Sequence, residues 1–272
     1  MENKASETKS LNGSALNKAD ETKSLNGSAL NKGEKTKGLS GSALKIIAII
    51  SMFIDHIACV FIENNLGNQK FLNATPITVQ QWTIIDGILR EIGRLAFPLF
   101  CFTIVQGAIF TSNKKKYVLR LFLFSILSEI PFDLAFFNTP FYLNYQNVFF
   151  TMALGLCAIY GIQYWKDNKW MRWLAVIAAA VVAELLHTDY GAGGVIIITL
   201  FYAFRFEEKA KILLGSFFEI FVMGIWEAGA VFAFIPMHFY NGKRGFGMKY
   251  FFYIFYPAHL LLLWMINRFM FG

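Results

Sequence analysis

The stretch LKIIAIISMFIDHIACVFI, residues 44–62, decides the class of fold. Its basic and acidic side chains are Lys45, Asp55 and His56, and nearly all of the other residues are apolar. A helix that crosses the hydrocarbon core of a bilayer needs roughly 17–25 mostly apolar residues. This stretch therefore predicts a membrane-spanning helix.

Similar apolar runs follow along most of the chain. The whole sequence is 56% hydrophobic and only 16% charged, whereas a soluble domain carries about 25% charged residues. We therefore expect an all-α, polytopic transmembrane bundle of about nine spanning helices. The run 211–240 is also compatible with one long broken helix. The eight further predicted segments are 94–111, 117–137, 147–165, 171–187, 191–205, 211–225, 228–240 and 249–269.

The first 43 residues differ in composition from the rest. They are polar and contain a 14-residue repeat, in which Lys9–Lys18 recurs as Lys23–Lys32 and a third copy begins at Lys37. One leucine pair per repeat is too little apolar surface to bury, which is typical of a disordered segment. We therefore divide the chain into a disordered tail, 1–43, and a transmembrane domain, 44–272.

The loop charges predict an orientation. Lys and Arg collect in cytoplasmic loops of membrane proteins, and here basic and non-basic loops alternate when 63–93 is taken as a loop. This pattern places the N-terminus in the cytoplasm. The net charge of +7 is then explained by anchoring at a lipid bilayer and not by binding to nucleic acid. The basic loops carry Lys114–Lys116, Lys166 and Lys169, Arg205 and Lys209, and Lys243 and Arg244.

Ionisable side chains inside apolar segments are the candidates for function. They are costly at membrane depth, although buried polar groups also join helices by hydrogen bonds. Glu129, Glu184 and Glu219 are interpreted as such structural or pairing groups. The functional candidates are Asp55, His56, Arg94, Asp189 and His259.

His56 is the candidate general base. Adjacent helical side chains diverge by about 100°, so Asp55 and His56 do not form a ready-made dyad. We therefore expect the carboxylate that orients His56 to come from another helix, with Asp189 or Asp133 as donor.

Lys45 and His56 are eleven residues apart, which places them on one helix face and about 16 Å apart along the axis. This spacing suits a long anionic thioester with its phosphates at Lys45 and its acyl group near His56. It also suits an ordinary helix whose lysine reaches the membrane surface.

The glycine-rich segment 241–247 surrounds Lys243 and Arg244. Such a loop can offer backbone N–H groups and cations to a phosphate, or it can be a flexible connection between helices. It lacks the GxxxxGK[ST] pattern of a P-loop. The three cysteines, Cys59, Cys101 and Cys157, lie in apolar segments, which argues against disulfides and against a metal site.

Eight stretches together resemble the TraX family, named for a membrane protein that acetylates the N-terminus of conjugative pilin. The Lys45-to-His56 spacing is also similar to the basic-x10-His pattern of the acyltransferase-3 membrane enzymes. The resemblance covers about residues 44–265. The stretches that carry it are Leu44–Ala48, Met52–His56, Gly93–Phe100, Lys116–Leu121, Ser128–Phe132, Asp189–Gly191, Asn241–Gly245 and Phe252–Leu260.

The resemblance implies a multi-pass acetyltransferase of the bacterial cytoplasmic (inner) membrane, with cytoplasmic acetyl-CoA as co-substrate. The acceptor would be an amine or hydroxyl of an extracytoplasmic peptide or glycan. On this hypothesis His56 is the base, Asp189 or Asp55 orients it, and Arg94 stabilises the oxyanion or holds an acceptor carboxylate. His259 is then a second base or a buried hydrogen-bonding group. The predicted acetyl-CoA contacts are Lys45, Asn241, Lys243, Arg244 and Lys249.

Two other classes of function fit the same residues. In a multi-pass transporter or flippase, the buried charges would form a substrate path, but no convincing similarity between two halves of the chain is visible. In a non-catalytic assembly subunit, the same charges would serve helix packing alone.

Overall fold

The computed structural model describes residues 38–247 and 249–272, and it leaves the side chains of Ile225, Trp226 and Lys249 undescribed. Residues 1–37 of the predicted disordered tail, 1–43, lie outside this part. The predicted boundary is wrong for the rest of the tail, because Ser40 caps α2 and residues 41–43 form its first turn. The described residues form one compact unit, Gly38–Gly272.

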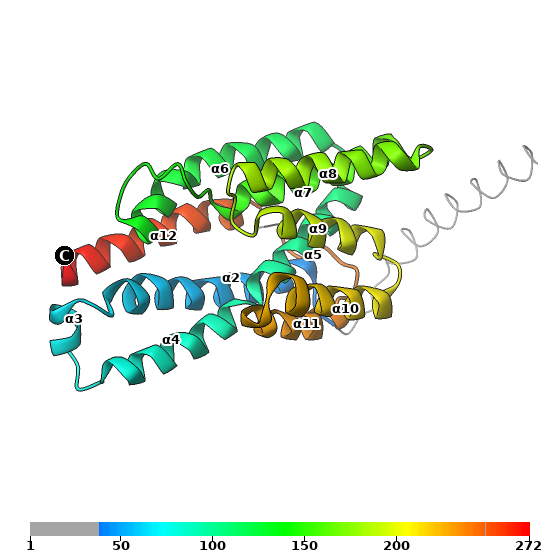
Figure 1. Ribbon diagram of the computed structural model, residues 1–272. Helices are drawn as coiled ribbons and strands as arrows, with labels where there is room; N and C mark the ends of the chain where they lie inside the picture. The colour runs from blue at the N-terminus through cyan, green and yellow to red at the C-terminus, as the bar shows by residue number, and fades with distance from the viewer. Residues whose placement is uncertain (1–37, 248) are drawn as a thin grey trace, which may run out of the picture. The chain divides into compact units, whose positions relative to one another are not determined.

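Throughout the described part the regular elements are helices, as predicted (Figure 1). The chain first forms α2 (Gly41–Ile57), which continues through a π-helical turn, η1 (Ala58–Ile62), and a 3-10 turn, η2 (Glu63–Asn65). The remaining α-helices are α3 (Gln69–Asn73), α4 (Val79–Gly93), α5 (Ala96–Phe110), α6 (Lys114–Phe137), α7 (Val148–Tyr164), α8 (Lys169–Leu185), α9 (Gly191–Ala203), α10 (Glu208–Phe217), α11 (Phe234–His238) and α12 (Lys249–Phe271). Two further elements are η3 (Phe218–Met223) and η4 (Ile225–Ala233).

Three helical runs within the described residues are long and apolar enough to cross a membrane: Gly41–Asn65, Val79–Phe110 and Tyr250–Phe271. Val148–Tyr164 and Gly191–Ala203 are apolar but shorter. These runs support a membrane protein. They do not confirm nine spanning helices.

The predicted loop 63–93 is wrong, because α3 and α4 lie within it. The Thr78 hydroxyl accepts a hydrogen bond from the Gln81 backbone N–H at 3.3 Å and caps the start of α4. Ile84, Ile88 and Ile92 form an exposed stripe at helical spacing, 42–57% exposed. Polar and charged residues interleave this stripe and lower the hydropathy of the segment, so the composition indicated a loop.

The run 211–240 is interrupted at Gly224. This glycine has a φ of 120°, which residues with a side chain rarely adopt. The chain therefore leaves the helical path between η3 and η4, and the two predicted segments are separate elements. Both are built from short helical pieces, so neither forms one straight span.

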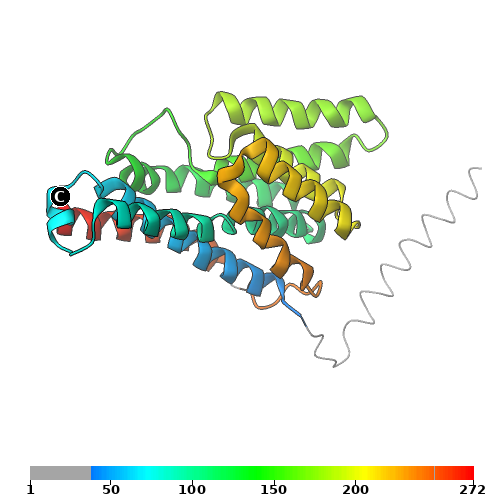
Figure 2. The ribbon, with the colours of Figure 1, turned by 60° about the horizontal axis from the view of Figure 1, so that its bottom comes forward.

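α2 lies at the centre of the packing and contacts α4, α5 and α12. Figures 1 and 2 both show α2 running beside α4 and α12. Leu44 and Ala48 of α2 are fully buried. Ser40 begins the helix, because its hydroxyl accepts a hydrogen bond from the Ala43 backbone N–H at 3.3 Å.

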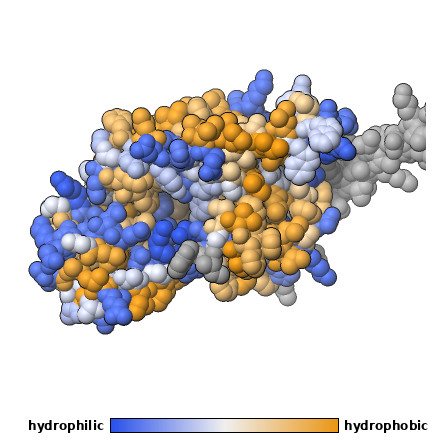
Figure 3. Space-filling view, viewed as in Figure 1, coloured by the Kyte–Doolittle hydropathy of each residue, from blue (hydrophilic) through white to orange (hydrophobic). Residues whose placement is uncertain are grey.

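α6, α7, α8 and α9 form the second part of the bundle, with α8 at its edge. Leu174, Ile177, Val181 and Leu185 of α8 are 49–73% exposed and recur at helical spacing. Figure 3 shows a hydrophobic band on the side of the unit where α6, α7 and α8 lie. Such an exposed apolar face on a helix fits contact with lipid.

The basic turns gather at one end of the unit. Figure 1 shows the turns after α5, α7, α9 and α11 on the side where α2 begins, and the turns after α6 and α8 away from it. The Lys114 ammonium lies 5.3 Å from the Tyr160 ring, which joins the start of α6 to the end of α7. The alternation of loop charges therefore corresponds to two chemically different ends.

Candidate active site

A pair of histidines joins α2 to α12. His56 Nδ1 and His259 Nε2 are 2.6 Å apart, and the two ring planes are parallel to within 2°. The exposed fractions are 8% for His56 and 4% for His259. The sequence predicted both residues as candidates but left open whether they meet.

The hydrogen bonds fix which nitrogens of a neutral pair carry protons. His259 Nδ1 lies 2.7 Å from the Phe255 carbonyl oxygen, which can only accept, so Nδ1 carries the proton of that ring. His259 Nε2 is then an acceptor, and His56 Nδ1 donates to it. The proton-free nitrogen that remains is His56 Nε2, which is the form a general base requires.

Aromatic rings hold the histidine pair in place. His56 lies edge-to-face with Phe136 and Tyr256, at centroid distances of 5.3 and 6.0 Å, and Phe255 lies 4.7 Å from the His259 ring. The π-helical turn η1 begins two residues after His56, and such turns occur frequently at functional sites. The rings therefore restrict both imidazoles to one arrangement.

The expectation that a carboxylate orients His56 is wrong. Asp55 Oδ2 accepts from Arg90 Nη1 at 2.8 Å, Asp189 Oδ1 from the Tyr145 hydroxyl at 2.9 Å, and Asp133 Oδ2 from the Tyr142 backbone N–H at 2.8 Å. The observed partner of His56 is His259, because consecutive side chains on α2 point in different directions and α12 packs against the His56 side.

Asp55, Arg94 and Asp189 come together in a charged cluster with Arg90 and Glu227. Arg94 Nη1 lies 3.0 Å from Glu227 Oε1, and Asp55 lies within electrostatic range of Arg90, Arg94 and Asp189. Burial raises the pKa of the Asp189 carboxyl, while the Tyr145 hydroxyl and the two guanidinium groups act in the opposite direction. Asp55, Arg94 and Asp189 thus lie together in the charged cluster. His56 belongs instead to the histidine pair.

Two of the three glutamates interpreted as structural groups are paired. The Glu129 carboxylate accepts from the Asn147 side-chain amide, and Glu184 Oε2 accepts from the Ala192 backbone N–H at 3.1 Å. Glu219 is 1% exposed, and neither of its oxygens has a hydrogen-bond partner among the described residues. The described residues therefore give no hydrogen bond that would support pairing of Glu219, and its structural role stays a prediction.

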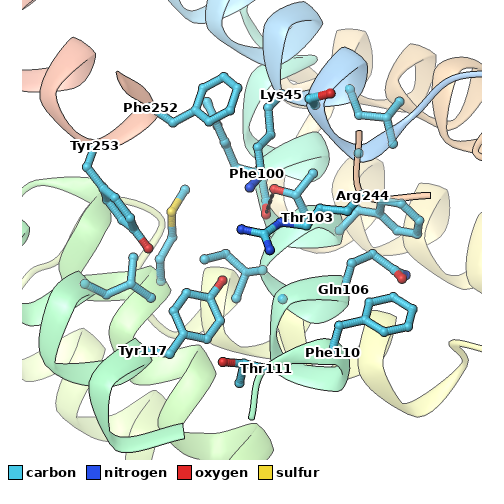
Figure 4. A pocket seen from close by; sticks show the side chains of 18 of the residues that line it. Lys45, Phe100, Thr103, Gln106, Phe110, Thr111, Tyr117, Arg244, Phe252 and Tyr253 are labelled. Carbon is cyan, nitrogen blue, oxygen red and sulfur yellow. Dashed lines mark hydrogen bonds between the residues drawn. The ribbon is translucent and has the colours of Figure 1, made fainter. Parts of the chain in front are cut away.

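A cavity of about 460 Å³ opens at the basic end, beside the first turns of α2. Lys45, Arg120 and Arg244 line it, and none of the described residues in its wall is an Asp or Glu. Figure 4 shows the Lys45 and Arg244 side chains extending into one shared space. Other lining residues that it labels are Phe100, Thr103, Gln106, Phe110, Thr111, Tyr117, Phe252 and Tyr253.

The glycine-rich loop positions Arg244 through its backbone. The Gly41 N–H donates to the Lys243 carbonyl at 2.8 Å, and the Ser42 N–H donates to the Arg244 carbonyl at 3.0 Å. The loop therefore caps the start of α2 and carries Arg244 into the cavity wall. These two N–H groups of the helix start are consequently not available to a phosphate.

The other predicted acetyl-CoA contacts lie elsewhere. Asn241 shapes the loop, since its Nδ2 donates to the Gly38 carbonyl at 3.2 Å and its Oδ1 accepts from the Lys243 backbone N–H at 3.0 Å. Neither Asn241 nor Lys243 is among the described residues that line the cavity. The side chain of Lys249 is outside the described part. Lys45 and Arg244 are thus the predicted contacts that reach the cavity.

Sequence reasoning missed Arg90 and Arg120. Arg120 was detectable, because it is a cation within the apolar segment 117–137. Arg90 was hidden by the interpretation of residues 63–93 as a loop.

The inner end of the cavity approaches the histidine pair. Met52 and Tyr256 belong to its wall. Met52 lies one helical turn before His56 on α2, and the Tyr256 ring is 6.0 Å from the His56 ring. α2 carries both Lys45 and His56, so the expected separation of about 16 Å along one helix holds.

A family model described as TraX protein matches residues 40–267. This chain belongs to the TraX family. The probable fimbrial assembly protein FimC, serogroup H1, of Dichelobacter nodosus is 32% identical to it over 245 residues, which cover 81% of this chain and 92% of that protein. No solved structure is significantly similar.

The TraX match includes the histidine pair, the charged cluster and the cavity. It begins at Ser40, the residue that caps α2. The repeated segment before Ser40 lies outside it. The family match therefore covers nearly all of the helical unit, Gly38–Gly272.

Proposed function

We propose that this TraX-family protein is a membrane-bound acetyltransferase that moves an acetyl group from cytoplasmic acetyl-CoA to an amine or hydroxyl of an extracytoplasmic peptide or glycan. The observation that carries the proposal is the continuity of the cavity. Its wall contains three cations at the basic end and reaches Met52 and Tyr256 next to His56.

The cavity chemistry suits a phosphorylated thioester. Lys45, Arg120 and Arg244 would pair with the CoA phosphates, since charge-assisted hydrogen bonds to phosphate are among the strong ones in proteins. The aromatic wall would contact the adenine ring and the apolar parts of the pantetheine arm. The absence of Asp and Glu from the described lining avoids repulsion of the anionic cofactor.

His56 Nε2 would take the proton from the acceptor as its nitrogen or oxygen attacks the thioester carbonyl. The tetrahedral intermediate would then collapse, breaking the C–S bond, and the CoA sulfur would leave with the proton returned by His56. His259 would act as a positioning residue, because its Nε2 accepts from His56 Nδ1 throughout and stabilises the imidazolium.

The charged cluster of Asp55, Arg90, Arg94, Asp189 and Glu227 would bind the acceptor. Arg94 belongs to this cluster, where it pairs with Glu227, and not to the histidine pair, so we assign it to acceptor binding and not to oxyanion stabilisation. The name of the Dichelobacter nodosus relative supports a fimbrial subunit as acceptor.

A transporter or flippase is the second candidate, favoured by the ion pairs Asp55–Arg90 and Arg94–Glu227 within helical segments. The two candidates differ in their need for acetyl-CoA and for His56. An acetyltransferase releases CoA in the presence of an acceptor, whereas a transporter moves a solute without CoA.

The test is CoA release from acetyl-CoA by the purified full chain in detergent, with fimbrial-subunit peptides and glycans as acceptors. His56→Ala is expected to lower turnover about 10²–10⁴-fold, the usual contribution of a general base. His238→Ala is the matched control, because His238 is an exposed histidine paired with Glu208. Equal turnover in wild type and His56→Ala would reject His56 as the base. Absence of acetyl-CoA binding together with solute movement in liposomes would favour the transporter.

A further inference from the structure

A second basic pocket lies at the ends of α7, α8 and α9. Its volume is about 500 Å³, and its wall contains Gln163, Lys166, Arg172, Tyr202 and Arg205. None of the described residues in this wall is an Asp or Glu. The pocket has no part in the proposed acetyl transfer, because it shares no lining residue with the cavity beside α2.

The three cations of this pocket are not neutralised by the protein. Neither Lys166, Arg172 nor Arg205 forms an ion pair with a carboxylate within the described part of the chain. Arg205 is nevertheless fixed, since its Nη1 donates to the Tyr202 carbonyl at 2.7 Å and its guanidinium lies 4.4 Å from the Tyr202 ring. A preorganised, uncompensated group of cations favours an anionic ligand.

Exposed aromatic side chains mark the level of the pocket. Three aromatic residues lie within a few positions of its lining residues in the sequence: Tyr164, Trp170 and Phe206. Their side chains are 79%, 74% and 81% exposed, respectively. Tyr and Trp concentrate at the headgroup level of a bilayer, where an apolar ring meets water. Exposed rings beside the pocket therefore favour a position at the headgroup level.

We propose that this pocket binds the phosphate of an anionic phospholipid headgroup. Basic pockets between transmembrane helices on the cytoplasmic side suit such headgroups. A zwitterionic lipid would bind less tightly, because its ammonium group would be repelled by the same three cations. Phosphatidylglycerol and cardiolipin lack that ammonium group, and they represent the expected class.

The test is native mass spectrometry of the full chain in detergent, titrated with phosphatidylglycerol or with phosphatidylcholine. Wild type is expected to retain phosphatidylglycerol with at least tenfold preference. Lys166→Gln/Arg172→Gln is expected to lose that preference and to fold normally, because both side chains are exposed. Lys115→Gln/Lys209→Gln removes the same charge from exposed positions outside the pocket and is expected to behave as wild type.

Two results would overturn the assignment. Equal loss of phosphatidylglycerol from both double variants would show attraction to the basic end as a whole and no defined site. Full displacement of phosphatidylglycerol by millimolar inorganic phosphate, at constant ionic strength, would identify a site for soluble anions. Because the readout is lipid binding, neither result depends on acetyl transfer.

Discussion

His56 Nδ1 and His259 Nε2 lie 2.6 Å apart although 203 residues separate them in the chain. The contact joins α2, which carries Lys45 at the cavity, to α12, which contributes Phe252, Tyr253 and Tyr256 to the same cavity. The two helices that carry the histidine pair thus also form much of the proposed acetyl-CoA site.

Replacing His259 is expected to reduce kcat and leave KM for acetyl-CoA unchanged, since His259 holds the base and does not line the cavity. We expect a loss of about 10–100-fold for His259→Phe, which has no acceptor for His56 Nδ1. His259→Gln retains an acceptor oxygen and is expected to recover part of the rate. Steady-state kinetics of both variants test this, and equal losses with raised KM would indicate a packing role alone.

Removing a cation from the cavity is expected to weaken acetyl-CoA binding. Arg244→Gln and Lys45→Gln should each raise KM for acetyl-CoA about tenfold, equivalent to about 1.4 kcal/mol of lost charge-assisted bonding. Lys243→Gln is the control, because it makes the same charge change one residue from Arg244 but outside the cavity wall. A similar rise in KM for Lys243→Gln would point to the overall charge of the loop instead.

A methyl group at Gly93 is expected to displace Asp55 from Arg90. A Cβ at position 93 would meet the Asp55 carboxylate at less than contact distance, whereas one at Gly87 would meet nothing within 4 Å. Gly93→Ala should therefore lower the free energy of unfolding by about 1–3 kcal/mol. Gly87→Ala in the same helix should raise it by about 0.5–1 kcal/mol. Thermal unfolding in detergent measures both, and equal effects would refute the steric argument.

Arg94 and Glu227 are expected to be energetically coupled. Their charged atoms are 3.0 Å apart, and their side chains are 21% and 13% exposed. A double-mutant cycle with Arg94→Gln and Glu227→Gln should give a coupling energy of about 0.5–3 kcal/mol. Additive effects on unfolding would show that the pair does not hold the end of α4 against η4.

The candidate site was only partly predictable. Lys45 and His56 could be placed on one helix face, because their relation depends on helix geometry alone. The sequence could not show that Asp189 does not contact His56. The position of Asp189 depends on the turn between α8 and α9 and on the hydrogen bond from Tyr145. Arg90 escaped prediction because residues 63–93 were interpreted as a loop, whereas Arg90 lies on α4 and pairs with Asp55 of α2.

The sequence by itself determined the helical class, the apolar runs and the alternation of basic and non-basic turns. These properties follow from local composition and from the period of a helix, which a short window contains. Tertiary structure alone decided that His259 and not a carboxylate faces His56, and that Arg120 joins Lys45 and Arg244 in one cavity. Those relations depend on how α2, α6 and α12 pack, and packing is set by contacts between residues far apart in the chain.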